Sequence, residues 1–301
     1  MNRFTIFFGI LLLLGCNRSV ETKETRKEYK FSFVFMTDIH MQNKRGAYEA
    51  FQMVIDTVNK MDAAFVVTGG DLVYDVMRGR PQRSDSLFSL YKESISKFKV
   101  PVHNTIGNHE LFGIYAESDI DSLHPDYKYG LYERQIGKTH HSFDYGGWHF
   151  ISVNSIVEKN QRYIGLISEE EKEWIKAEIA ETDPTTPIAL VTHIPFVTSF
   201  YQVHEWDDIE VPNGRQIANS AEILELFKDH NLKLVLQGHV HWVEDINVKG
   251  KIRFITGGAV AGRPSWRGAQ HNEEGFMYMH IGQHDEISWD YIDYGWEARV
   301  E

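Results

Sequence analysis

The chain is nearly devoid of cysteine, since Cys16 is the only one among 301 residues. An internal disulfide is therefore impossible, and structural zinc sites built from several thiolates are ruled out. Positive charge is also scarce, because 31 Lys and Arg stand against 43 Asp and Glu and give a formal net charge of -12. This balance argues against binding of a nucleic-acid polymer, which rests on clusters of Lys and Arg.

An apolar run long enough to cross a bilayer is missing from the N-terminus. The run from Thr5 to Leu14 spans only about ten residues, which suits the apolar region of a signal peptide. It leads into Leu13-Leu14-Gly15-Cys16, which resembles the cleavage box of bacterial lipoproteins, where the cysteine becomes the lipidated first residue. The alternative is an ordinary signal peptide in which Cys16 is incidental.

The lipoprotein interpretation divides the chain into three parts. Residues 1–15 are the signal peptide, residues 16–30 are a polar tether, and residues 31–301 are the folded domain. We expect a protein attached to the bacterial cell envelope by a lipid on Cys16, facing the periplasm or the cell surface. The sequence leaves the oligomeric state open.

What the chain does have is apolar material for a large core, with 42% hydrophobic and 13% aromatic residues. Strands and helices alternate early and strands dominate late, and no linker interrupts residues 31–301. This order predicts one α/β domain with a mixed sheet in a sandwich. The expected strands are 31–36, 64–67, 100–106, 141–145, 148–153, 187–191, 232–236, 242–248, 252–255 and 276–281, and the expected helices are 47–61, 84–98, 168–180 and 220–230.

Five of these strands are followed at once by residues that can bind metal ions. The carboxyl edge of an α/β sheet is where ligands bind, so these residues should lie close together. Imidazole, carboxylate and one amide, with no thiolate, suit Mn, Fe, Zn or Ni. If the protein acts on phosphates, metal ions rather than basic side chains should supply the positive charge. The predicted ligands are Asp38, His40, Asp71, Asn108, His193, His239 and His241.

Seven such side chains are too many for one ion with open positions, and they suit two ions that share a carboxylate. Two ions about 3.5–4 Å apart can hold a hydroxide between them as the nucleophile and bind the oxygens of an in-line displacement at phosphorus. His239 and His241 pose a geometric question here. On an extended backbone, side chains two residues apart point to the same face.

The ordered blocks DIH, GGDLVY, GNHE, THIP and GHVH, from Asp38 to His241, resemble the calcineurin-like metallophosphoesterase superfamily. The resemblance implies a β-sandwich flanked by helices. It also implies that Asp38, His40, Asp71 and His241 hold one ion, while Asp71, Asn108, His193 and His239 hold the other. His239 and His241 would then reach toward different ions. His109 would not bind metal, but would stabilise charge on the phosphate and protonate the leaving oxygen.

Tyr74 bears on the branch of the superfamily. GDxxY followed by GNHE resembles the purple acid phosphatases, in which this tyrosine binds iron, but those enzymes lack a histidine at the position of His40. The DxH to GHxH set also resembles the class III cyclic nucleotide phosphodiesterases. We expect His40 to bind metal and Tyr74 to remain unliganded, and we expect Asp75 or Glu110 to orient His109.

The resemblance leaves the substrate open. We expect a small organic phosphate ester, either a monoester or a diester, contacted by Tyr74, Arg162, Trp266 and Arg267. These residues lie within or next to the segments between the blocks, where aromatic and arginine side chains suit a substrate with a stackable group. The alternative is an envelope lipoprotein that keeps the fold as a binding protein.

Overall fold

The strand β1 (Phe31–Met36) shows how the sequence builds two separate layers of core. Alternate residues of a strand face opposite sides. In the computed structural model, which describes residues 28–203, 213–261 and 274–296, Phe31, Phe33 and Phe35 face a second sheet. Val34 and Met36 face the other way and join the larger core beneath the helices. The phenylalanines therefore fill the space between two sheets.

The first sheet has the strand order β13-β12-β1-β2-β3. β1, β2 and β3 run parallel, whereas β12 lies antiparallel to both β1 and β13. Because β1, β2 and β3 are parallel, the loops at their carboxyl ends emerge at one edge. The bounds are β2 (Val66–Thr68), β3 (Val102–His103), β12 (Gly275–Ile281) and β13 (Ile287–Asp293).

The second sheet has the order β10-β11-β9-β8-β5-β4. Its central strands β5, β8, β9 and β11 are parallel, and β4 and β10 are antiparallel additions at the two edges. The bounds are β4 (His141–Tyr145), β5 (Trp148–Ser152), β8 (Pro187–Val191), β9 (Asn231–Gln237), β10 (Glu244–Val248) and β11 (Ile252–Thr256).

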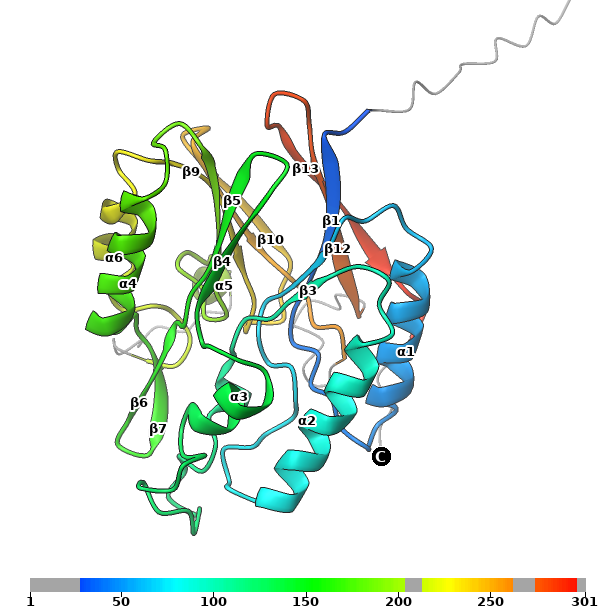
Figure 1. Cartoon of the computed structure of the whole chain (residues 1–301), viewed down its shortest axis with the longest axis vertical. Helices are drawn as coiled ribbons and strands as arrows, with labels where there is room; N and C mark the ends of the chain where they lie inside the picture. The colour runs from blue at the N-terminus through cyan, green and yellow to red at the C-terminus, as the bar shows by residue number, and fades with distance from the viewer. Residues whose placement is uncertain (1–27, 204–212, 262–273, 297–301) are drawn as a thin grey trace, which may run out of the picture.

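Helices cover the outer faces of both sheets (Figure 1). α1 (Ala47–Val58) and α2 (Pro81–Ile95) lie beside the first sheet, and α4 (Glu169–Ala180) and α6 (Ser220–Leu226) lie beside the second. The apolar stripe of α1, with Phe51, Val54 and Ile55, is fully buried in the larger core. The predicted single α/β domain, a β-sandwich flanked by helices, is confirmed.

Several short elements occupy segments that the sequence pattern left as loops. They are the 3₁₀ turn Asn108–Glu110, α3 (Gly130–Gln135), α5 (Phe200–Val203), and the hairpin of β6 (Ile156–Lys159) and β7 (Arg162–Gly165). The hairpin turns at Asn160 and Gln161, both with positive φ. That backbone fits the two-residue turn that matches strand twist.

The ends of some elements differ from those expected. α2 begins at Pro81 rather than Ser84, because proline suits the first turn of a helix. β10 begins at Glu244 rather than Trp242, because the preceding residues belong to the loop of His239 and His241. α4 starts directly after Ser168, whose hydroxyl accepts the backbone N–H of Glu171 at 3.2 Å.

The expected signal peptide, the tether up to residue 27 and Cys16 lie outside the described residues. So do Trp266 and Arg267. Across the described segments, 28–203, 213–261 and 274–296, no helix is both long enough and apolar enough to cross a membrane.

Candidate metal centre

The residues of the predicted metal site all follow strands that end at one edge of the sandwich. Their loops hold an unusual backbone, since many of these side chains stand on residues with positive φ. L-residues rarely adopt this left-handed conformation, although Asn, Asp and His do so more readily than others. The predicted ligands in this conformation are Asp38 (φ 55°), His40 (φ 48°), Asp71 (φ 52°), His239 (φ 73°) and His241 (φ 54°).

The first group of side chains consists of Asp38, His40 and His241, whose ligand atoms lie within 4.8 Å of one another. The Nε2 atom of His241 lies 3.0 Å from Asp38 Oδ1 and 3.2 Å from His40 Nε2. Atoms that bind one ion at 2.0–2.2 Å in a tetrahedral arrangement stand roughly 3.3–3.6 Å apart. The spacing of this group therefore fits the donors around a single ion.

The second group consists of Asp71, His193 and His239, together with the amide of Asn108. His193 Nε2 lies 3.0 Å from Asn108 Oδ1, 3.3 Å from Asp71 Oδ1 and 3.2 Å from His239 Nδ1. The other nitrogen of His193 is 2.8 Å from the carbonyl oxygen of Gly69, to which it donates. That bond leaves Nε2 free of a proton in the neutral ring, as a metal ligand requires.

Asp71 links the two groups. It is also part of a third cluster with His40 and His109, whose candidate ligand atoms lie within 4.8 Å of one another. Its Oδ1 accepts the backbone N–H of His109 at 2.9 Å, and its side chain is almost completely buried. Asp71 therefore occupies the position of a carboxylate that two ions could share.

His239 and His241 belong to different groups because the backbone after β9 is not extended. Both have positive φ, so the rule that alternate side chains share a face does not apply to them. His241 joins Asp38 and His40, whereas His239 joins Asp71 and His193. The backbone N–H of His239 is held by Asp38 Oδ2 at 3.0 Å, which ties the loop to β1.

Charge in the cluster is arranged for binding cations. Burial alone would raise the pKa of both carboxyls, but His241 lowers the pKa of Asp38, and His193 and His109 lower that of Asp71. Burial, together with His193, lowers the pKa of His239 to about 3. Burial, together with His109, lowers the pKa of His40. The carboxylates are therefore ionised while His40 and His239 are neutral, as ligands must be.

When no ion is bound, His193 carries a proton that a bound ion would displace. Burial would lower its pKa, but the charge and hydrogen bond of Asp71 outweigh that effect and raise it to about 9. This imidazolium balances the carboxylates beside it. A divalent ion would supply the same compensation, so the cluster fits a metal centre on the chemistry of its own donors.

His109 lies at the edge of the centre, and its side chain is 15% exposed. Its Nδ1 accepts the backbone N–H of Asp75 at 3.0 Å. A backbone N–H can only donate, so the neutral ring carries its proton on Nε2, which lies 3.7 Å from Asp71 Oδ2. Asp75 thus orients His109, but through its backbone and not through its carboxylate.

Glu110, the other expected orienting group, has a different task. Its two carboxylate oxygens accept the backbone N–H groups of Val73 at 3.0 Å and Gly107 at 2.7 Å, and the side chain is fully buried. Val73 follows Asp71 and Gly107 precedes Asn108, so Glu110 joins the two loops that carry these residues.

Tyr74 packs against the site. Its ring stacks on His109 at a centroid distance of 5.5 Å and meets the edge of His40 at 6.2 Å. Arg162 is exposed on β7. Its neighbour Tyr163, which the sequence analysis did not single out, lies edge-to-face with His239 at 6.0 Å. The feature of the sequence that could have indicated Tyr163 is an aromatic residue two positions after Gln161, the second residue of the hairpin turn.

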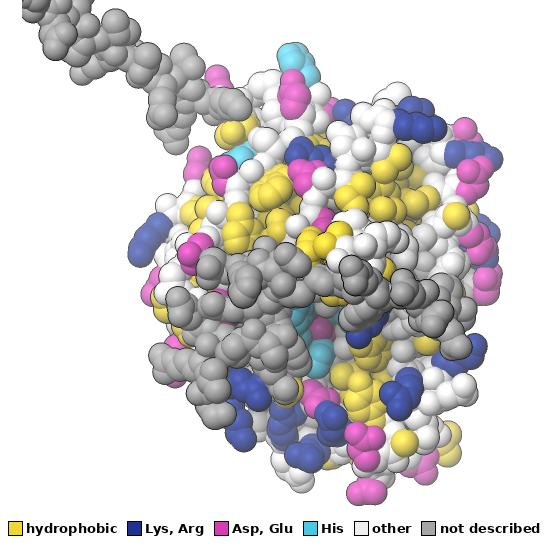
Figure 2. Space-filling model, turned by 180° about the vertical axis from the view of Figure 1, so that it is seen from behind, with side chains coloured by type: hydrophobic (Ala, Val, Ile, Leu, Met, Phe, Trp, Pro, Cys, Tyr) yellow, Lys and Arg dark blue, Asp and Glu magenta, His cyan; other side chains and the backbone are white. Residues whose placement is uncertain are grey.

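Figure 2 shows histidine and acidic side chains close together near the middle of one face of the molecule, and a group of Lys and Arg side chains gathers below them. The composition gave no sign of such a group, because the net charge of the chain is strongly negative.

Comparisons with known proteins agree with this geometry. The model of the family described as calcineurin-like phosphoesterase matches residues 31–243. A probable cyclic nucleotide phosphodiesterase of Xenorhabdus bovienii (strain SS-2004) is 20% identical over 221 residues, which cover 69% of this chain and 77% of that protein.

Two solved structures illustrate the similarity of fold. A dimetal phosphatase from Danio rerio superposes with a TM-score of 0.62 at 15% identity, over 89% of this chain and 97% of that one. GAP50, the anchor in the inner membrane complex of Plasmodium, superposes with a TM-score of 0.55 at 16% identity, over 88% and 85%. The matched family model spans all five motif blocks, and the chain belongs to the calcineurin-like phosphoesterase family.

Proposed function

We propose that the protein is a hydrolase of phosphate esters that works with two bound transition-metal ions. The observation that carries this proposal is the convergence of imidazole and carboxylate atoms into two groups joined by Asp71. When bound, a pair of ions activates water as the nucleophile and withdraws charge from the phosphate oxygens. The donor set suits Mn, Fe, Zn or Ni.

In this proposal Asp38, His40, Asp71 and His241 hold one ion. Asp71, Asn108, His193 and His239 hold the other, with Asp71 shared. The distances of 3.0–3.8 Å between donor atoms within each group support the assignment.

His109 is the residue that acts on the substrate directly. With Nδ1 occupied by the backbone of Asp75, its Nε2–H is the group available to the phosphate. There it donates a hydrogen bond to an oxygen on which charge develops, and because the ring is neutral it stabilises that charge and keeps its proton. Tyr74 acts through His109, by packing on its ring, and does not bind metal. We also propose that Arg162 contacts the organic part of the substrate.

The test uses the chain without its N-terminal 27 residues, reconstituted with Mn²⁺. Turnover of p-nitrophenyl phosphate is compared with that of bis-p-nitrophenyl phosphate. We expect Mn²⁺-dependent release of nitrophenol, loss of activity in Asp71→Asn, and a fall of about hundredfold or more in kcat for His109→Ala. The exposed substitution Lys60→Gln serves as the control, since Lys60 is exposed after the end of α1 and belongs to none of the motif blocks.

The two substrates separate the remaining alternatives. Preference for the diester would align the protein with its relative from Xenorhabdus bovienii, named as a probable cyclic nucleotide phosphodiesterase. Preference for the monoester would make it a phosphatase. If Mn²⁺ binds in the wild type but neither ester nor natural phosphate esters turn over, hydrolysis is refuted and the fold serves as a binding protein.

We also propose that Cys16 carries a lipid that attaches the protein to the bacterial cell envelope. The support is the Leu13-Leu14-Gly15-Cys16 box after a short apolar run. The full-length wild type should sediment with membranes, whereas the Cys16→Ala variant should remain in the supernatant. Equal membrane association of wild type and Cys16→Ala would contradict the proposal.

A further inference from the structure

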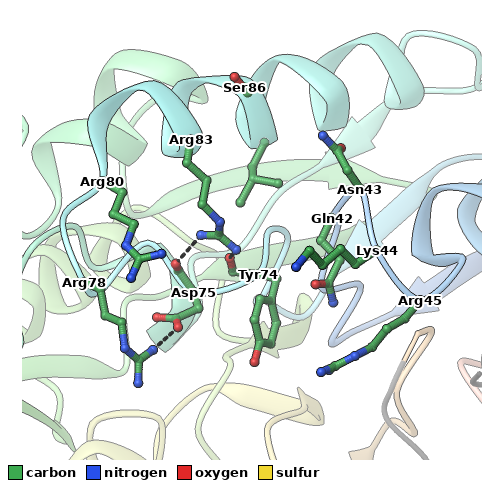
Figure 3. Close-up of a pocket in the computed structure, with 11 residues that line it drawn as sticks. Gln42, Asn43, Lys44, Arg45, Tyr74, Asp75, Arg78, Arg80, Arg83 and Ser86 are labelled. Atoms are coloured by element: carbon green, nitrogen blue, oxygen red, sulfur yellow. Dashed lines mark hydrogen bonds and ion pairs between the residues drawn. The ribbon is translucent and has the colours of Figure 1, made fainter. Parts of the chain in front are cut away.

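A cavity of about 580 Å³ opens beside the candidate metal centre (Figure 3). We call it the basic pocket and define it by its five cationic side chains and the tyrosine at its wall. These are Lys44, Arg45, Arg78, Arg80, Arg83 and Tyr74. In Figure 3 the arginines reach in from the start of α2 and the loop before it, while Lys44 and Arg45 reach in from the loop that precedes α1.

Tyr74 forms a shared wall between the pocket and the metal centre. One ring of this residue both lines the pocket and stacks on His109 at 5.5 Å. The two loops that form the pocket are also tied together, because Met41 pairs with Val73 in a parallel bridge. The loop that contributes Lys44 and Arg45 begins four residues after His40. A ligand that fills the pocket could therefore reach the centre along one side of Tyr74.

Charge in the pocket is poorly balanced by the protein itself. Asp75 is the single carboxylate among the described residues of the lining, and it is paired with Arg78, which also forms an ion pair with Glu117 at 3.3 Å. Arg83 donates to the backbone carbonyls of Tyr74 and Asp75 at 3.0 and 2.8 Å. Among the described residues, Lys44 and Arg80 form no ion pair with a carboxylate.

The amino end of α2 adds to this positive field. Arg80 is its N-cap residue, no side chain caps the helix, and no acidic residue stands in its first turn. The positive end of a helix dipole normally attracts Asp or Glu, but the first turn of α2 has no acidic residue and its N-cap is an arginine. The arrangement occurs in a chain of net charge -12, where cations so grouped cannot be ascribed to general basicity.

We propose that the basic pocket binds a second phosphate group of the substrate, so that the enzyme acts on phosphate esters that carry another phosphate beyond the scissile one. This inference rests on the proposed hydrolase function. A phosphate dianion offers three acceptor oxygens, which matches several convergent Arg and Lys donors better than a carboxylate does. The cavity also leaves room for the organic group that links the two phosphates.

The test measures phosphate release from matched substrates by the Mn²⁺-loaded protein. Adenosine 3′,5′-bisphosphate is compared with adenosine 5′-monophosphate, and glucose 1,6-bisphosphate with glucose 6-phosphate. The variant Lys44→Gln/Arg80→Gln removes the two cations that have no ion pair in the described structure. Lys60→Gln/Lys138→Gln removes the same charge from exposed positions outside the pocket and controls for long-range attraction.

We expect the wild type to favour the bisphosphate member in at least one pair, through a lower KM. In the pocket variant the ratio of the two kcat/KM values should fall by about tenfold, since two charge-assisted contacts are lost. The control variant should keep the wild-type ratio. The inference is overturned if the wild type shows no preference for either bisphosphate, or if pocket and control variants lose it equally.

Free inorganic phosphate is another source of the same chemistry. If added phosphate changes turnover of p-nitrophenyl phosphate in the wild type but not in the pocket variant, and no bisphosphate is preferred, the pocket holds an effector and not a substrate group. If neither p-nitrophenyl phosphate, bis-p-nitrophenyl phosphate nor any natural phosphate ester is hydrolysed, the proposed function fails. If calorimetry then shows that pyrophosphate binds to the wild type and not to the pocket variant, the pocket is an anion-binding site. Its role in binding a substrate for hydrolysis would be refuted.

Discussion

Glu110 offers a sharp test of how the metal centre is held together. It is fully buried, and its two oxygens accept the backbone N–H groups of Val73 and Gly107. Burial and the nearby charge of Asp71 raise its pKa to about 8, although both N–H groups favour the ionised form. Charged or neutral, a carboxyl group keeps lone pairs on both oxygens, so it can accept both hydrogen bonds.

Glu110→Gln changes this balance with almost no change in shape. The amide nitrogen of glutamine cannot accept, so one backbone N–H is left buried without a partner and faces another donor. An orphaned buried donor costs about 1–3 kcal/mol. The loops of Asp71 and Asn108 should also be held less firmly, so we expect weaker Mn²⁺ binding in addition to lower stability.

The assay is equilibrium unfolding of the metal-free protein in guanidinium chloride. We expect a lower transition midpoint with an unchanged slope, followed by a higher Kd for Mn²⁺ in calorimetry. Glu93→Gln, on the exposed side of α2, is the matched control and should behave as wild type. A midpoint and Mn²⁺ affinity for Glu110→Gln equal to those of Glu93→Gln would refute the reasoning.

Three further predictions concern Gly107, the effect of Mn²⁺ on thermal stability, and His103. Gly107→Ala would place a methyl group against the backbone and carboxylate of Asp71, so it should cost about 3 kcal/mol in unfolding experiments, and wild-type stability would contradict this. Saturating Mn²⁺ should raise the thermal midpoint by about 5 °C in the wild type and not in Asp71→Asn, as followed by scanning calorimetry. Burial and His141 lower the pKa of His103 to about 4, below the unfolded value of about 6.5. The contribution of His103 to the free energy of unfolding should therefore be fully present above pH 6.5 and be lost as the pH falls toward 4. An equally steep loss of stability in His103→Gln would exclude this residue as a cause.

The sequence predicted the sandwich and the positions of the motif residues because apolar strands end abruptly at Asp, His and Gly. β1 and β8 match their expected bounds, since FSFVFM and PIALV are short apolar runs with clear ends. The start of α2 was misjudged because the proline at its first turn was given too little weight.

Other features depend on contacts that a linear pattern does not display. β13 was missed although Ile287, Trp289 and Tyr291 alternate along it and pack on the inter-sheet core, because its polar residues conceal the repeat. The β6–β7 hairpin turns at Asn-Gln and not at the commoner Asn-Gly. The basic pocket joins residues 44–45 to residues 78–83, which the pairing of Met41 with Val73 and the backbone hydrogen bonds beside it bring together.

The left-handed backbone of the metal loops has a thermodynamic consequence. Each L-residue in that conformation costs roughly 1 kcal/mol, less for Asp and His than for branched residues. Glycine would remove that cost at Asp38, His40 or Asp71, but it would also remove a buried side chain and, at the two aspartates, the acceptor of a backbone N–H. The fold therefore loses some folding stability in order to hold the donor atoms of the site in place.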